Sequence, residues 1–260
     1  MYVKKMPVFQ AGKVLTIEML DALKSAIEAT ENLKYSGYSD GVLHGFQVEI
    51  ADDYLIVEKG AFIYQEELYA VSEKTKILYA GNGETQLLVL RIGDKEKTSN
   101  FEIREAEFKL IPDGDEILSD LEIARFRLQK GARLRNQFQG LRDMNTSYDT
   151  LNLCHARWSA FGGNTMAYPI LEMAAREIEK KNNADIYDEM LLEAIYSAKG
   201  ESIPGVMIDR YLKRKLGKNV DVTTPEARYK ALLNAVNQMS TQEEAHHGEQ
   251  QKRNNRIIID

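Results

Sequence analysis

Histidine and cysteine side chains, which most often act as nucleophiles, general bases and transition-metal ligands, are scarce in this 260-residue chain. It has four histidines, which fall in three separate segments, and no HxxxH, HExxH or CxxC pattern occurs. We therefore expect no metal site. Adjacent residues point their side chains in different directions, so we expect no catalytic thiol–imidazole pair in the one place where cysteine and histidine meet. The residues concerned are His44, His155, His246, His247 and Cys154.

Glycines and carboxylates give equally little support for catalysis. Neither a phosphate-loop pattern nor a dinucleotide fingerprint is present. Gly81-Asn82-Gly83 lies between two strand-like runs and predicts a hairpin turn. The acidic pairs Asp52-Asp53, Glu66-Glu67 and Glu243-Glu244 lie beside turns or in charged stretches, as solvated carboxylates do. We expect that the chain is not an enzyme and binds no cofactor.

A cluster of basic residues is the strongest chemical signal. Between Ile123 and Arg142 there are six basic residues and no acidic one, whereas the whole chain has a net charge of −6. Only two aromatic residues lie near these cations, so we expect no nucleic-acid surface. Two interpretations remain: a solvated or salt-bridged sheet edge, and an electrostatic contact for an acidic partner chain. For the second, the candidate subunit-interface residues are Arg125, Arg127, Arg133 and Arg135.

The elements that would position this cluster are strands. Phe46-Gln47-Val48-Glu49-Ile50 alternates strictly between apolar and polar residues, as a half-buried strand does. Turn signals separate it from further short runs, which predicts an antiparallel β sandwich or small barrel over 41–135. A change of phase in the run 101–110 predicts a bulge or a shift of face near Glu105. The run 121–128 is expected to close the sheet. The further runs are 54–57, 61–64, 68–71, 76–79, 86–92, 101–110 and 121–128.

An N-terminal arm and one helix are predicted over 1–40. Thr16 can cap a helix that ends between Leu33 and Gly37. The apolar residues Leu20, Leu23 and Ile27 recur at spacings of three and four, so they form one face. That face packs either on its own domain or on a neighbouring subunit. We count these three residues as candidate interface residues.

Helices are predicted after a connector over 136–163. The segment 164–240 carries four helical patterns, the last opening at Thr224-Pro225 with a cap and a proline at the first helical position. We expect a small helical domain, which makes the chain an α+β protein: N-terminal helix, antiparallel β sandwich or small barrel, then a helical bundle. The polar segment 241–260 is predicted to be an extended tail, in which Ile257, Ile258 and Ile259 are candidate interface residues.

Localisation is indicated by what the sequence lacks. One cysteine excludes an internal disulfide. Apolar runs are only a few residues long, so we expect neither a signal peptide nor membrane insertion. We expect a soluble protein made in a reducing cytosol.

Three stretches resemble the N-terminal region of bacteriophage tail and baseplate structural proteins, which also occur in contractile tail-like particles. They are Phe9 to Leu20, Asp40 to Val48 and Tyr54 to Tyr64. In that family a G-V-x-x-G step, here Gly41-Val42-Leu43-His44-Gly45, introduces a strand, a second strand ends in a glycine, and a hairpin follows. The resemblance covers residues 8–130 and does not extend to the helical part.

The resemblance implies a non-enzymatic structural component of a phage tail or tail-like baseplate, which joins neighbouring subunits or attaches fibres. Its partners would be other tail or baseplate subunits, in homo- and hetero-oligomeric contacts, within a virion or particle made in the bacterial cytoplasm. The alternative is a receptor- or glycan-binding module, in which tyrosines of the β region stack on a ligand. Those residues are Tyr35, Tyr38, Tyr54, Tyr64 and Tyr69.

Overall fold

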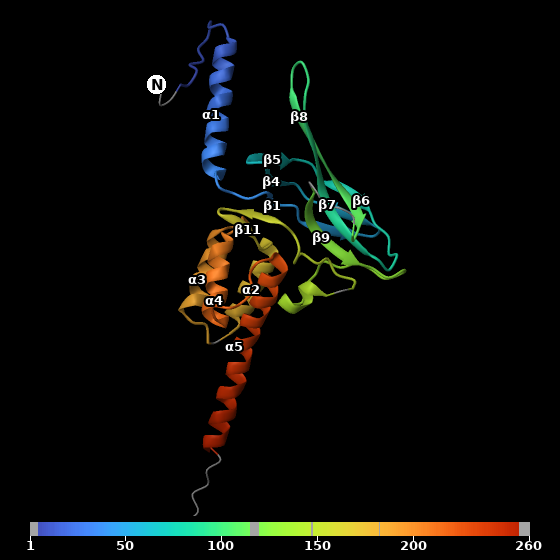
Figure 1. Cartoon of the computed structure of the whole chain (residues 1–260), viewed down its shortest axis with the longest axis vertical. Coiled ribbons are helices and arrows are strands. Elements are labelled where there is room, and N and C mark those ends of the chain that lie inside the picture. Colours follow the sequence, from blue (N-terminus) through green and yellow to red (C-terminus); the bar gives the residue numbers. More distant parts are fainter. Residues whose placement is uncertain (1–4, 115–119, 147, 182, 255–260) are drawn as a thin grey trace, which may run out of the picture.

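A computed structural model describes residues 5–114, 120–146, 148–181 and 183–254, with side chains as far as Met239. Figure 1 shows a projecting N-terminal helix, a body of strands, and a group of helices from which the last one extends. The α+β class is therefore confirmed. The helices are α1 (Ile17–Tyr35), α2 (Tyr168–Glu179), α3 (Ile186–Ser197), α4 (Gly205–Leu216) and α5 (Pro225–Asn254), with a 3-10 turn at Leu141–Asn145.

The strands form three sheets, with orders β11-β10-β1-β4-β5, β2-β3-β6 and β8-β7-β9. Over the described residues none of these closes into a barrel, because β9 lies at an edge and pairs with β7 as its one neighbour in the sheet. The barrel alternative and the closing role of 121–128 are therefore wrong. The strands are β1 (Gly41–Gly45), β2 (Val48–Ala51), β3 (Tyr54–Val57), β4 (Gly60–Tyr64), β5 (Glu67–Val71), β6 (Thr75–Leu78), β7 (Thr85–Lys97), β8 (Glu102–Pro112), β9 (Leu121–Arg127), β10 (Trp158–Ala160) and β11 (Gly163–Thr165).

Two bulges shape the third sheet. Ile92 pairs with Ala106 and Lys95 with Arg104, so two residues of β7 face Glu105 alone: the irregularity lies at the predicted position, but the extra residue belongs to β7 and not to the run 101–110. In β9 the pairing skips Ile123, which interrupts the alternation. As a result the first four residues of β9, which the sequence assigns to alternating faces, are all buried.

Gly81-Asn82-Gly83 does not form a hairpin. It connects β6 to β7, and these strands belong to different sheets. A β-carbon on Gly81 would lie 2.5 Å from the Gln129 carbonyl oxygen, so glycine permits a close approach of two backbones here. The segment does connect two strands, but whether those strands pair with each other depends on pairing between residues distant in sequence.

The G-V-x-x-G step lies where three backbone segments meet. β1 pairs antiparallel with β4 and parallel with β10, at Val42 and Trp158. Gly41 has a φ of 153°, and a β-carbon there would lie 2.7 Å from the Ser159 nitrogen. At Gly45, with a φ of 80°, it would lie 2.4 Å from the Lys59 carbonyl oxygen. Both glycines are needed for close strand packing.

One hydrophobic core joins strands and helices. The largest cluster of buried residues extends from Val42 in β1 to Met239 in α5. Tyr229 of α5 is fully buried and donates a hydrogen bond to the Leu141 carbonyl oxygen at 2.5 Å. Strands β10 and β11, which overlap the predicted connector 136–163, belong to the five-stranded sheet. The β part and the helical part are thus packed as one body.

The segment 241–254 is not an extended tail. α5 continues to Asn254, and Figure 1 shows its second half extending beyond the other helices. This stretch of sequence is rich in Glu and Gln, which favour helix once a preceding turn is formed. Ile257, Ile258 and Ile259 lie outside the described residues.

Candidate assembly surfaces

Helix α1 projects from the body and buries none of its residues, all of which the structure describes. Its start is confirmed, because the Thr16 hydroxyl accepts a hydrogen bond from the Met19 N–H at 3.3 Å. Leu20 and Ile27 are 48% and 53% exposed, and Leu23 is half-buried. The predicted apolar face therefore exists, and among the described residues none of its side chains is fully buried. Other large apolar side chains exposed on or before α1 are Val8, Phe9, Val14, Leu15, Ile17 and Leu33.

The N-terminal arm lies beside α1 and leaves an open groove of about 960 Å³. Lys5 holds the arm through an ion pair with Glu18 at 2.7 Å. Both partners are exposed, so this pair contributes little stability. The groove is lined by Lys5 and Met6 of the arm and by α1 residues that include Ala22, Leu23 and Ala26.

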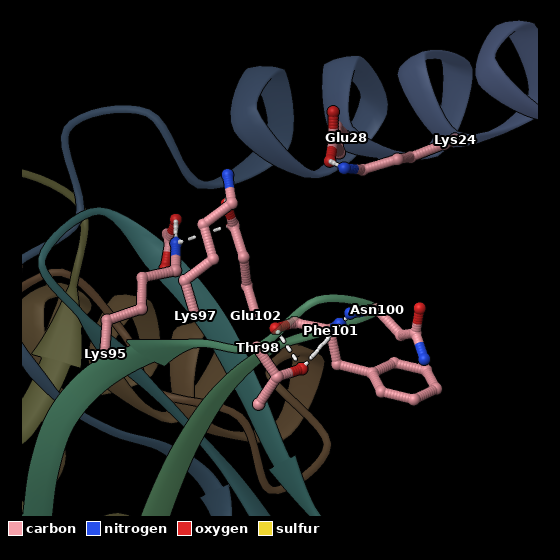
Figure 2. Close-up of polar contacts among 9 residues, drawn as sticks. Lys24, Glu28, Lys95, Lys97, Thr98, Asn100, Phe101 and Glu102 are labelled. Carbon is pink, nitrogen blue, oxygen red and sulfur yellow. Dashed lines mark hydrogen bonds and ion pairs between the residues drawn. The ribbon is translucent and has the colours of Figure 1, made fainter.

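The hairpin of β7 and β8 reaches toward α1. In Figure 2, Lys24 and Glu28 lie on α1 above the hairpin, where Lys97 bonds Glu102 at 3.1 Å. The pKa of Glu102 is lowered by the hydrogen bond from Lys97 and further by the positive charges of Lys97, Lys95 and Lys24. At the tip, Phe101 is 69% exposed. The hairpin thus projects next to α1, with charged residues facing that helix and the apolar side chain of Phe101 at its tip.

The basic cluster is partly neutralised within the chain. Arg125 makes a bidentate pair with Glu122, with N···O distances of 2.6 and 2.7 Å. Arg135 makes another with Asp143, with distances of 2.6 and 2.7 Å. For these two arginines the structure favours the salt-bridged interpretation over a contact with a partner.

The other two candidate arginines are exposed. Arg127 donates to the Gly83 carbonyl oxygen at 2.7 Å, and its guanidinium lies 5.2 Å from the centre of the Tyr148 ring. Arg133 lies on the loop after β9. The four arginines therefore do not form one uniform surface, because two are paired internally and two face solvent.

Four of the five candidate stacking tyrosines are engaged within the chain. Tyr35 and Tyr38 contact each other edge to face, with ring centres 5.4 Å apart. Arg104 lies over Tyr64 and Tyr69, at 5.0 and 5.7 Å from the ring centres. Burial and a hydrogen bond to Glu67 raise the pKa of Tyr69 to about 12. Tyr54, at the start of β3, is exposed.

A surface that sequence reasoning missed lies on α3 and α4. Met190, Val206 and Met207 are among the apolar residues of the helical patterns in 164–240, and they are 61%, 68% and 45% exposed. The buried positions are Leu191, Leu192 and Ile195 of α3 and Ile208, Tyr211 and Leu212 of α4. A signal was available, because each helix has more apolar residues than one buried face can hold.

Between α3 and α4 the exposed side chains enclose a groove of about 240 Å³, which we call the α3–α4 groove. Its lining is apolar except for two arginines, and the Arg214 guanidinium lies 5.6 Å from the centre of the Tyr187 ring. Methionine-rich apolar surfaces are typical of protein-binding sites because the side chain adapts its shape. The lining residues are Tyr187, Met190, Leu191, Ala194, Met207, Arg210, Tyr211 and Arg214.

A buried ion pair fixes the two helices beneath the groove. Asp188 is completely buried; it accepts from Lys215 at 2.7 Å and from the Tyr211 hydroxyl at 2.9 Å. Lys215 also bonds Asp185 at 2.9 Å. Burial raises the pKa of Tyr211, which keeps its hydroxyl protonated as a donor. The groove therefore lies on a rigid support.

The groups with the most reactive chemistry are not gathered together. Cys154 is 1% exposed, and burial raises the pKa of its thiol. His155 lies 3.9 Å from Glu226, and burial lowers the pKa of its imidazole. Among the described residues no three His, Cys, Asp or Glu side chains lie close enough to hold a metal ion. Within the same part of the chain, no helix has the length and apolar content that crossing a membrane requires.

Sequence comparison found no matching family model and no matching curated protein. Structure comparison found a chain of the type VI secretion system TssK-TssF-TssG baseplate subcomplex, with a TM-score of 0.40 and 11% identity, covering 91% of this chain and 99% of that one. A crystal structure of TssK gave 0.37 and 9%, covering 90% and 69%. A chain of the type VI secretion baseplate complex gave 0.35 and 11%, covering 92% and 99%.

Proposed function

We propose that this chain is a non-enzymatic structural component of the baseplate of a phage tail or contractile tail-like particle. In that role it joins neighbouring subunits or attaches fibres. The proposal combines the resemblance of residues 8–130 to tail and baseplate proteins with the positions of the exposed apolar side chains.

Helix α1 is the observation that carries the proposal. It has 19 residues, and none of them is buried in the single chain. Most helices in proteins are stabilised by burying an apolar face, and the face with Leu20, Leu23 and Ile27 is uncovered in the single chain. A neighbouring subunit that covers this face would supply the missing stabilisation.

Separate surfaces for several neighbours are the second support. The tip of the β7–β8 hairpin, with Phe101, and the α3–α4 groove lie on different parts of the body (Figure 1). Binding of one small substrate requires convergent groups in one pocket. Exposed apolar groups spread over projecting elements instead fit a subunit that touches several others.

A test of this function uses tagged chain expressed in the bacterium that encodes it. Tail-like particles are purified, and the tagged chain is quantified in them by mass spectrometry. The test variant, Leu20→Asp with Ile27→Asp, places two charges on the exposed apolar face. The matched control, Ser25→Asp with Asn32→Asp, adds the same charge to the polar side of the same helix.

We expect wild type and control in baseplate-containing particles at a fixed ratio to the other subunits, and the test variant at less than about a tenth of that ratio, since burying an unpaired charge costs several kcal/mol. Loss of fibres from otherwise complete particles would indicate attachment, and loss of the particles themselves would indicate subunit joining. Absence of the wild-type chain from every purified particle would contradict the proposal.

A further inference from the structure

The proposed function requires that copies or neighbours meet, and two uncovered surfaces of this chain match each other. We propose that α1 of one copy docks in the α3–α4 groove of a second copy. This inference rests on the proposed function in one respect: it names the chain itself as one of the partners.

Shape and polarity agree between the two surfaces. The groove presents Met190 and Met207 between two helices of 12 residues each, which are about 18 Å long at 1.5 Å per residue. On α1 the apolar residues Leu20, Leu23 and Ile27 span about 10 Å along the helix, which is less than the length of the two helices that line the groove. An amphipathic helix laid in an apolar groove is a common mode of protein recognition.

Charge selects α1 as the occupant. Along Ile17–Tyr35 there are four acidic residues and two basic ones. The two charged residues that line the groove, Arg210 and Arg214 of α4, are both basic and exposed, although α3 as a whole carries Asp188, Glu189 and Glu193 and no basic residue. Two copies of α1 packed on each other would bring together surfaces of the same net sign, whereas α1 on α4 pairs opposite signs. The acidic residues of α1 are Glu18, Asp21, Glu28 and Glu31.

The occupant comes from another copy because the base of α1 is fixed in its own chain. The Gly162 N–H donates to the Gly37 carbonyl oxygen at 2.9 Å, and the Ser39 N–H donates to the Ala160 carbonyl oxygen at 3.2 Å. Tyr38 also packs edge to face on Phe161. From this base α1 points away from α3 and α4 (Figure 1). Folding back within one chain would break these contacts.

The contact joins two different surfaces, so it has two ways to close. Exchanged reciprocally between two copies it gives a two-fold dimer, and repeated with another fixed rotation it gives a ring or an open filament.

Disulfide trapping between two differently tagged proteins tests the contact. One carries Leu20→Cys and the other Met207→Cys; both positions are exposed, and the native Cys154 is buried. We expect a disulfide-linked heterodimer after mixing and oxidation, and at least about tenfold less dimer from either protein alone. Dimers of the Leu20→Cys protein alone would show that α1 pairs with α1. A third protein carries both Leu20→Cys and Met207→Cys. An intrachain disulfide in this protein, without heterodimer from the mixture, would show that α1 folds back. Either result overturns the inference.

Charge reversal provides a second test that does not depend on cysteine placement. Arg210→Glu with Arg214→Glu should weaken self-association at least about tenfold in sedimentation velocity. Adding Asp21→Lys and Glu28→Lys should restore most of the loss, because opposite charges again face each other. The control, Lys59→Glu with Lys76→Glu, reverses two exposed cations on the β part of the chain and should leave association unchanged.

Failure of this inference is distinguishable from failure of the proposed function. If heterodimer does not form, but wild type enters particles and Leu20→Asp with Ile27→Asp does not, α1 binds a different subunit and only the copy-to-copy contact is wrong. If the wild-type chain is absent from all particles, the proposed function fails whatever the cross-linking shows.

Discussion

Asp143 illustrates how a single carboxylate is fixed by its local partners. Its oxygens accept from Arg135 at 2.6 and 2.7 Å and from the Gln139 N–H at 3.0 Å. The hydrogen bond from Arg135 is the main reason why the pKa of Asp143 lies well below its usual range. A carboxyl whose folded pKa is depressed adds stability above its unfolded pKa, about 3.9, and this stability is lost as the pH falls toward the folded value.

We therefore predict a pH-dependent effect of Asp143→Asn. At pH 7 the substitution should lower the free energy of unfolding by about 1–2 kcal/mol, because the pair is bidentate but partly exposed. The difference from wild type should shrink as the pH falls below about 4. Urea unfolding at pH 7, 5, 4 and 3 would measure it, with Asp94→Asn on the exposed hairpin as control. A difference that grows on acidification would contradict the assigned pairing.

Asp188 is the residue whose loss should destabilise the helices most. Asp188→Ala removes the buried one of the two carboxylate partners of the Lys215 ammonium, which is only 15% exposed, and leaves the Tyr211 hydroxyl without its acceptor. Breaking a buried pair by removing one partner typically costs about 3–5 kcal/mol. Thermal unfolding should show a clearly lower Tm, and Glu189→Ala at the neighbouring exposed position should change it little. Equal effects of the two substitutions would contradict the role of Asp188.

Side-chain partners of this kind were beyond sequence reasoning. The run of six basic residues is visible in the sequence, but Arg135 is paired by a loop carboxylate and Arg125 by Glu122 only because a bulge at Ile123 changes which residues share a face. Long-range packing also decides which tyrosines are free: Arg104, 35 residues after Tyr69, covers two of the rings. A local pattern shows where charged and aromatic residues lie in the sequence, but tertiary contacts decide which partners their side chains have.

At the scale of elements, shortening a leucine side chain to alanine should destabilise the chain much more in α2 than in α1. Leu171 in α2 is completely buried, so Leu171→Ala should cost about 2–5 kcal/mol in the free energy of unfolding. Leu20 in α1 contacts no core, so Leu20→Ala should cost less than about 0.5 kcal/mol in the isolated chain. Urea titration of both variants under non-associating conditions would measure this. A large loss for Leu20→Ala would mean that α1 packs on its own chain.

Element starts were predictable where a local hydrogen bond defines them. The cap at Thr16 and the cap at Thr224, whose hydroxyl accepts from the Ala227 N–H at 3.1 Å, follow from residue type alone. Strands β10 and β11 were not predictable, because each has only three residues. β10 is held by pairing at Val42, more than 100 positions away, and β11 by the short turn that joins it to β10. The continuation of α5 to Asn254 was also missed, since polar composition was read as an extended tail.

At the scale of the whole molecule, the shared core predicts a single cooperative unfolding transition. Buried residues from β1 to α5 form one cluster, and Trp158, the one tryptophan in the sequence, lies in it beside Val42. We expect Trp158 fluorescence and helical circular dichroism to change at the same urea concentration. Transitions separated by more than about 0.3 M would mean that the strands and the helices unfold independently as separate domains.

The most direct test of the account is amide hydrogen exchange of Ile17–Tyr35, measured in the isolated chain and in the assembled particle. Because α1 buries no residue in the single chain, its amides should exchange within about tenfold of the unstructured rate when the chain is alone. In the particle they should exchange at least about 100-fold more slowly, since a neighbouring subunit covers the face with Leu20 and Ile27. Strong protection of α1 in the isolated chain, or equally fast exchange in both states, would contradict the claim that this helix is an assembly surface.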